Sequence, residues 1–231
     1  MERFSDLIDT VVDFNGTTFR NIPSVMPSED LLDDLSDNPN DRAFGEALVT
    51  DQKSLDYQSP IIMRPFLYGV SLDGGASARL PTRFSDGGKF GVWYGSLSLL
   101  TTVHETVYHW KSRLSDMLTT IREEVFSDRR VFKVAARGVI IDLRDKHERF
   151  PGLIDPDDYA YTNALGEHLH NNGQRGLLVR SARHPEGVNL AAFKPDILSE
   201  PRHHTYLSYR WVPGEPAVRV ERAVGKVWRR I

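Results

Sequence analysis

The chain has 231 residues, 40% of them hydrophobic and 26% charged, which is typical of a soluble globular domain. It has no cysteine, which excludes disulfides, thiolate catalysis and zinc sites built on cysteine. The net charge of −3 is uneven, since residues 1–60 hold 13 Asp and Glu against 4 Lys and Arg, and no dense basic stripe of the nucleic-acid-binding kind occurs.

The beginning of the chain has neither a long apolar run nor a basic leader. No stretch of about 18 apolar residues occurs, which argues against a membrane span. The acidic start, "MERFSDLIDTVVDF", lacks the parts of a secretory signal. We therefore expect a cytoplasmic location.

Residues 1–60 predict a helical N-terminal extension within a single domain. An amphipathic helix is expected up to about Phe14, followed by a turn and a short strand before Pro23 that carries Arg20. Ser28 precedes "EDLLDDL" as the N-cap of an acidic helix, and residues 41–56 predict another helix. The main core is expected over residues 61–231.

The rest of the chain mixes strands and helices irregularly. In chain order we expect a strand over residues 61–70, a long Gly-rich loop over 71–91, a strand over 89–95, a helix capped by Ser96, a strand over 130–144, a helix over 155–173, strands over 175–181 and 188–193, and a hairpin of strands over 204–212 and 217–224. This order predicts the α+β class, with a compact mixed sheet and flanking helices.

Glu105 is the one acid between Lys89 and Lys111, and it lies in the helix expected after Ser96. On a 3.6-residue period it lies opposite an apolar seam made of Leu100, Val103, Val107, Trp110 and Leu114. Its own side carries hydroxyls instead of Lys and Arg. Two interpretations remain open: the polar wall of a cleft centred on Glu105, or a charge-poor surface helix with a weak Glu105–His109 pair. The nearby "HETVYH" is no zinc motif, because His104 and His109 are five residues apart and point about 140° apart on a helix.

Four further residues carry open questions. Arg83 lies in a Gly-rich loop that suits a phosphate, but it can also be an ordinary loop arginine, and Arg20 raises the same question. Tyr94 can stack on a planar ligand or pack in the core. Ser181 follows the apolar strand "GLLV", where ligand contacts and turns are both common, and no GxSxG surrounds it.

Together these segments resemble the RES-domain family, named for a characteristic Arg, Glu and Ser, whose members are toxins of bacterial toxin–antitoxin pairs. The resemblance is carried by "FRNIPS", "SDGGKFGVWYGSLSLLTTVHETVYH", "DPDDYAYTNALG" and "GLLVRSARHPEGVNLAAFKP", which span roughly residues 19–195. Arg83, Tyr94 and Glu105 are spaced evenly by eleven residues, similar to the family's core spacing.

The resemblance implies a role for each candidate. Arg20 and Arg83 would be the phosphate-binding arginines, Tyr94 the aromatic residue beside the nicotinamide, Glu105 the key acid and Ser181 the family serine. The implied fold is similar to that of ADP-ribosyltransferase toxins, and the implied activity is consumption of NAD. Some family members split NAD with phosphate, while hydrolysis and ADP-ribosyl transfer are known more widely for this fold.

Two departures from the family pattern affect the arginines. The familiar "GGRW" is here "PTRF", and the stretch between Arg20 and Arg83 is unusually long, which leaves Arg64 as a second candidate for the first arginine. Asn189, in "GVNLAAF", is expected among the substrate-binding residues. We expect no metal and no resident cofactor, with NAD as substrate and inorganic phosphate as co-substrate.

The resemblance also implies a partner, an Xre-type helix-turn-helix antitoxin that silences the site in a hetero-oligomer. No direct contact with nucleic acid or membrane is expected. Two alternatives to NAD phosphorolysis or hydrolysis stay open: ADP-ribosyl transfer to a protein target, and a catalytically silent module that keeps the fold and docks a partner.

Overall fold

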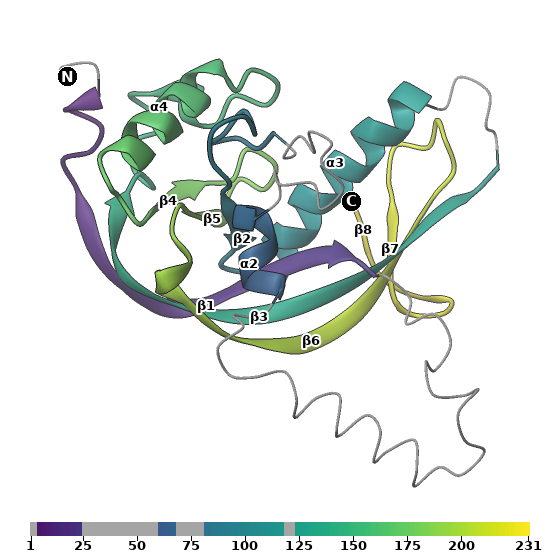
Figure 1. The fold of residues 1–231 in the computed structure, drawn as a ribbon. Helices are drawn as coiled ribbons and strands as arrows, with labels where there is room; N and C mark the ends of the chain where they lie inside the picture. The colour runs from purple at the N-terminus through teal and green to yellow at the C-terminus, as the bar shows by residue number, and fades with distance from the viewer. Residues whose placement is uncertain (1–3, 25–59, 68–80, 118–122) are drawn as a thin grey trace, which may run out of the picture.

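A computed structural model describes residues 4–24, 60–67, 81–117 and 123–231 (Figure 1). Its elements are β1 (Val11–Pro23), α2 (Pro60–Leu67), β2 (Trp93–Ser96), α3 (Leu99–Met117), β3 (Val125–Asp142), α4 (Ala160–Asn171), β4 (Gly176–Arg180), β5 (Val188–Ala192), β6 (Leu198–Trp211), β7 (Arg219–Ala223) and β8 (Lys226–Arg230), with 3-10 turns at Pro151–Leu153 and Pro195–Ile197. The helices expected after Ser28 and over residues 41–56 lie outside the described residues. No described helix has the length and apolar character needed to cross a membrane.

One mixed eight-stranded sheet organises the molecule, in the order β1-β2-β5-β4-β3-β6-β7-β8. The β3–β4 pair is parallel, and the other pairs are antiparallel. Since β1 pairs with β3 as well as with β2, five strands close on themselves into a ring. The long strands β1, β3 and β6 curve beneath the helices (Figure 1). The predicted α+β class, with a mixed sheet and flanking helices, is confirmed.

The helix predicted up to Phe14 is wrong. Residues 4–7 make a single turn, closed by hydrogen bonds from the Leu7 and Ile8 N–H groups to the Phe4 carbonyl, and β1 begins at Val11. From Val11 the exposure of side chains alternates along the strand. This two-residue period fits a strand whose inner side chains pack in the core, and pairing with β3 along all of β1 stabilises it. β1 is therefore part of the sheet.

The strand predicted over residues 61–70 is also wrong, because α2 occupies residues 60–67. Ile62 is buried, and the Trp93 indole N–H donates to the Ile61 carbonyl at 3.0 Å. Gly91 permits a close backbone approach, since a Cβ built there would lie 1.9 Å from the Pro65 carbonyl oxygen. A short apolar run fits a buried strand or a buried helix equally, so the period alone could not decide.

The other predicted elements that fall on described residues are confirmed with adjusted bounds. Helix α4, strands β4 and β5 and the β6–β7 hairpin lie where the sequence placed them, and β3 begins earlier, at Val125. The sequence did not predict β8, which extends the sheet beyond the hairpin.

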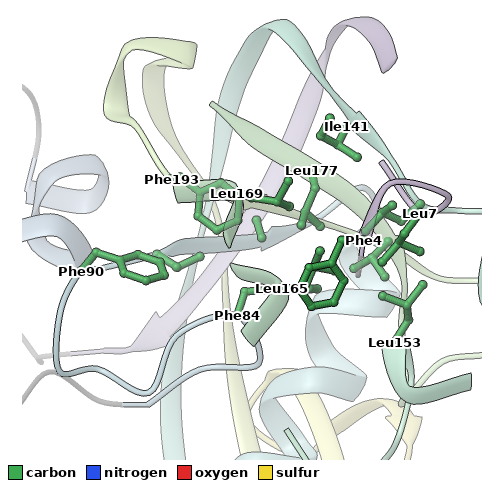
Figure 2. Close-up of a cluster of buried hydrophobic side chains, with 14 residues drawn as sticks. Phe4, Leu7, Phe84, Phe90, Ile141, Leu153, Leu165, Leu169, Leu177 and Phe193 are labelled. Carbon is green, nitrogen blue, oxygen red and sulfur yellow. The ribbon is translucent and has the colours of Figure 1, made fainter. Parts of the chain in front are cut away.

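Two core clusters fix the segments that carry the candidate site. In the first, shown in Figure 2, Phe84 packs with Leu165 and Leu169 of α4 and with Leu153. The Phe84 carbonyl also meets Gly166, where a Cβ would lie 2.0 Å away, so the loop beside Arg83 is pressed onto α4. In the second, the seam of α3 packs on β3 and β6 through Val103, Val107, Trp110 and Leu114, with Leu99 in the place expected for Leu100. This packing turns Glu105 away from the seam.

Candidate functional site

The Glu105 carboxylate is buried and held by two neutral donors. The Ser181 hydroxyl and the Asn189 amide both donate to its Oε1 atom, each at 2.6 Å. Glu105 is 7% exposed and Asn189 is fully buried. No described residue donates a hydrogen bond to Oε2. These contacts favour the cleft interpretation of Glu105 over a weak surface pair with His109.

Ser181, the residue that follows β4, joins the end of this strand to α3 through a hydrogen bond to Glu105. Its Oγ donates to Glu105 and accepts the backbone N–H groups of Arg183 and His184 at 3.1 and 3.0 Å. A hydroxyl has one proton, and here that proton is committed to the carboxylate. The geometry therefore makes Ser181 a holder of Glu105 and of the following loop, and does not make it a nucleophile.

The N-cap of α3 is Ser98, so the predicted cap at Ser96 is wrong. The Ser98 Oγ accepts the Thr101 N–H at 3.0 Å, the usual N-cap bond to the third helical residue. Ser96 ends β2 instead, and its hydroxyl donates to the Asn189 Oδ1 atom at 2.7 Å. Asn189 thus links β2 to Glu105, with its amide aligned by Ser96.

The Tyr94 hydroxyl is near enough to Glu105 and Arg83 for both charges to act on it. Arg83 is 6% exposed, and its Nη1 donates to the carbonyls of Asp155 and Leu153 at 2.7 and 3.4 Å. Burial, followed by the charge of Glu105, raises the pKa of the Tyr94 hydroxyl, while the charge of Arg83 lowers it. Tyr94 therefore stays protonated at neutral pH, within electrostatic reach of both charges.

Arg20 contacts this group through the backbone of Tyr94. The Arg20 Nη1 donates to the Tyr94 backbone carbonyl at 2.7 Å, and its guanidinium lies 5.2 Å from the Trp93 ring centroid. Burial, and then the charge of Arg64, lower the pKa of Arg20 to about 10, so it remains charged at neutral pH. Arg20 thus meets the backbone of Tyr94, whose side chain lies near Glu105. The two candidates for the first arginine are neighbours of each other.

A second group of residues, which the sequence analysis did not identify, joins α3 to the loop before α4. The Tyr108 hydroxyl donates to the Asp157 carboxylate at 2.8 Å, and the Arg183 guanidinium lies 3.3 Å from the Tyr108 ring centroid. Arg183 also donates to the Pro156 carbonyl and to the Tyr159 hydroxyl. The only signal in the sequence was the position of Arg183, two residues after Ser181.

The histidines beside Glu105 have separate environments. His104 stacks on His184 with ring centroids 4.7 Å apart, and the His184 Nδ1 atom lies 3.0 Å from the Thr101 hydroxyl. Burial, and then the charge of His184, lower the pKa of His104. Within the described ranges, no group of three His, Asp or Glu side chains is arranged to hold a metal ion.

Comparison with known proteins assigns the chain to one family. The RES domain family matches residues 56–212, more than half of the chain, and the chain therefore belongs to it. The matched region includes every candidate except Arg20, which precedes it. No curated protein matches the chain.

A solved structure supports the same fold. The crystal structure of the M. tuberculosis MbcT–MbcA toxin–antitoxin complex contains a chain that is 15% identical to this one, with a TM-score of 0.51. The alignment covers 92% of this chain and 94% of that chain. At this identity, the similarity establishes a shared fold.

Proposed function

We propose that the protein is a bacterial toxin that degrades NAD by cleaving the nicotinamide–ribose bond, with inorganic phosphate as the acceptor. The observation that carries the proposal is the buried Glu105 carboxylate, whose two donors bind one oxygen and leave Oε2 for a substrate. Membership of the RES domain family and the fold shared with a chain of a toxin–antitoxin complex support the toxin role.

In the proposed reaction the bond between the ribose C1 atom and the nicotinamide nitrogen breaks. Its electron pair goes to the nicotinamide ring, which leaves neutral without a proton, and a phosphate oxygen forms the new bond to C1. Positive charge develops on the ribose in the transition state. The Glu105 Oε2 atom binds a ribose hydroxyl and stabilises that charge, an electrostatic effect that needs no general acid.

The neighbouring residues take the roles of binding and orientation. Arg83 binds the diphosphate of NAD, since an arginine fork suits phosphate oxygens and its present partners are neutral carbonyls. The protonated Tyr94 lies beside the nicotinamide end. Ser181 and Asn189 hold Glu105 and contact the substrate from β4 and β5. Arg20 or Arg64 fills the remaining arginine role from the other side of Tyr94.

The toxin would be silenced by an Xre-type helix-turn-helix antitoxin in a hetero-oligomer located in the cytoplasm. The solved relative belongs to a toxin–antitoxin complex, which favours an antitoxin partner here. We also propose that the fold is similar to that of ADP-ribosyltransferase toxins. We expect no metal or resident cofactor to be needed.

The test is nicotinamide release from NAD by the purified, antitoxin-free chain, with and without phosphate. Glu105→Gln keeps the size of the side chain and removes its charge, and we expect a loss of about 10²–10³-fold in kcat. The matched control is Glu167→Gln, an exposed glutamate paired with Lys89. Phosphate-independent turnover would indicate a glycohydrolase, and a labelled protein acceptor would indicate ADP-ribosyl transfer. A folded wild type that releases no nicotinamide and labels no protein would refute the enzyme and favour the silent module.

A further inference from the structure

Arg183 reaches from the Ser181 loop into the space between α3 and the segment before α4. Its backbone N–H is bound by the Ser181 hydroxyl that also holds Glu105. Its guanidinium lies against the Tyr108 ring and donates to the Tyr159 hydroxyl at 3.3 Å and to the Pro156 carbonyl. The backbone of Arg183 is therefore anchored to Ser181, which holds Glu105. Its guanidinium lies at the other end of the side chain, against Tyr108 and Tyr159.

Not every N–H donor of the Arg183 guanidinium has a hydrogen-bond acceptor. Its Nε atom is buried without a hydrogen-bond partner. Among the described residues no carboxylate lies within 4 Å of either the Arg183 or the Arg83 guanidinium, and both donate to backbone carbonyls. A buried donor without an acceptor is costly, and a guanidinium gains most from an oxyanion that accepts several hydrogen bonds.

Arg83 and Arg183 flank one residue, Tyr159. The Arg83 guanidinium lies 4.5 Å from the Tyr159 ring centroid, and Arg183 bonds the hydroxyl of the same ring. The charges of both arginines act on Asp155, whose pKa is lowered chiefly by backbone hydrogen bonds. The two cations are therefore close enough to act on one ligand.

The acids beside these arginines are occupied by neutral donors. The Asp155 Oδ1 atom accepts the backbone N–H groups of Asp157 and Asp158 at 2.9 and 2.8 Å. The Asp157 carboxylate accepts the Tyr108 hydroxyl. Neither acid forms an ion pair with Arg83 or Arg183, so both guanidiniums are available to an incoming anion.

We propose that Arg183 and Arg83 form a phosphate-oxyanion site next to Glu105, in which Arg183 exchanges the Pro156 carbonyl for a phosphate oxygen. The ligand is either the diphosphate of the dinucleotide or inorganic phosphate, since both offer the same oxygens to the fork. The identity of the reaction rests on the proposed function, but anion binding is measured without turnover. Arg183 is thus a phosphate-binding residue in addition to Arg83 and to the first arginine, Arg20 or Arg64.

A purely structural role for Arg183, as a strut between α3 and the segment before α4, makes a different prediction. A strut would lower stability when it is removed and would leave anion affinity in the folded protein unchanged. Binding and melting must therefore be measured on the same variants. Arg183→Gln removes the charge, whereas Arg183→Lys keeps the charge and loses the fork. Arg130→Gln is the matched control, because Arg130 also stacks on an aromatic ring, 4.8 Å from the Phe132 centroid.

The experiment measures binding of ADP-ribose and of inorganic phosphate to the purified chain by calorimetry, with thermal melting to establish that each variant is folded. For Arg183→Gln we expect affinity for at least one anion to fall about tenfold to a hundredfold, with a smaller loss for Arg183→Lys and none for Arg130→Gln. A loss confined to ADP-ribose identifies the diphosphate as the ligand, and a loss confined to inorganic phosphate identifies the acceptor.

Two results would overturn the proposal. One is wild-type affinity for both anions in folded Arg183→Gln, with only the melting temperature lowered, which is the behaviour of a strut. The other is a wild-type protein that binds neither anion. Nicotinamide release in the Glu105→Gln comparison is scored separately, so that failure of the anion site and failure of the proposed reaction are told apart.

Discussion

The hydrogen bonds of Asn189 predict how much its removal lowers the free energy of unfolding. Its amide nitrogen donates to the Glu105 Oε1 atom at 2.6 Å, and its Oδ1 atom accepts the Ser96 hydroxyl at 2.7 Å. All three residues are buried. Asn189→Ala removes both bonds and leaves a carboxylate and a hydroxyl with fewer partners in a place that water reaches poorly.

The size of the effect can be worked from these two bonds. A hydrogen bond to a charged group contributes about 1.5–3 kcal/mol, and a neutral one about 0.5–1.5 kcal/mol. Asn189→Ala should therefore lower the free energy of unfolding by about 2–4 kcal/mol at neutral pH. In a Glu105→Ala background the charged bond is already absent, so the same substitution should cost only about 0.5–1.5 kcal/mol more.

Urea unfolding of the four proteins of this double-mutant cycle measures the coupling, provided that the dependence on urea stays the same. The control is Asn15→Ala, since Asn15 is exposed on β1 and should change stability by less than about 0.5 kcal/mol. A loss below about 0.5 kcal/mol for Asn189→Ala, or an equal loss in both backgrounds, would refute the view that Asn189 holds the carboxylate.

Three other changes test the structure around the site. Gly187→Ala places a Cβ 2.5 Å from the Thr101 Cγ2 atom, so it should push the Ser181 loop off α3, destabilise the fold by about 1–3 kcal/mol in chemical unfolding and reduce nicotinamide release. Asn21→Leu removes a partner of two buried polar groups, on Tyr209 and Arg129, and of the half-buried Thr106 hydroxyl, and it should cost about 2–4 kcal/mol in the same assay, whereas a neutral result would show that water replaces the amide. The pKa of His104 is lowered in the folded protein, so the unfolded chain takes up a proton first as the pH falls below about 6.5, and stability should decline in that range. His104→Gln should make this decline shallower in melting temperatures measured from pH 7 to 5.

The placement of Glu105 opposite a packed seam could be predicted from sequence because it depends on local periodicity. The seam through Val103 and Val107 needs only the 3.6-residue repeat, and the side chains that pack on β3 and β6 keep that repeat. The Ser181 and Asn189 bonds to Glu105 join residues 76 and 84 positions apart. No local sequence pattern relates residues so far apart. The position of Ser181 after an apolar strand made it an open candidate, and the resemblance to the family gave it a role in the site.

The errors have physical causes of the same kind. The short strand predicted before Pro23 is confirmed, but residues 11–14 belong to the same strand and not to a helix, because β3 offers a partner along the whole of β1, a tertiary contact that overrides local helical preference. The cap of α3 moved to Ser98 because Ser96 is engaged by Asn189, across the sheet. Arg183 went unnoticed because its importance depends on Tyr108 and on the Pro156 carbonyl, neither of which is near it in sequence.

Glu105 has no cationic partner in the part of the chain that the structure describes. The free-energy cost of burying its carboxylate is therefore only partly offset in the folded protein, which bears on the proposed chemistry. Among the described residues, no Lys, Arg or His nitrogen pairs with this carboxylate within 4 Å, although Arg83 lies within electrostatic reach of the neighbouring Tyr94. Two neutral donors offset only part of the cost of burying a carboxylate. A substrate that brings positive charge, such as the nicotinamide ring of NAD and then the ribose in the transition state, would supply the missing compensation at the moment of reaction. On the proposed function, an arginine salt bridge at this position would stabilise the resting protein and weaken that interaction, so neutral donors such as Ser181 and Asn189 suit the proposed reaction.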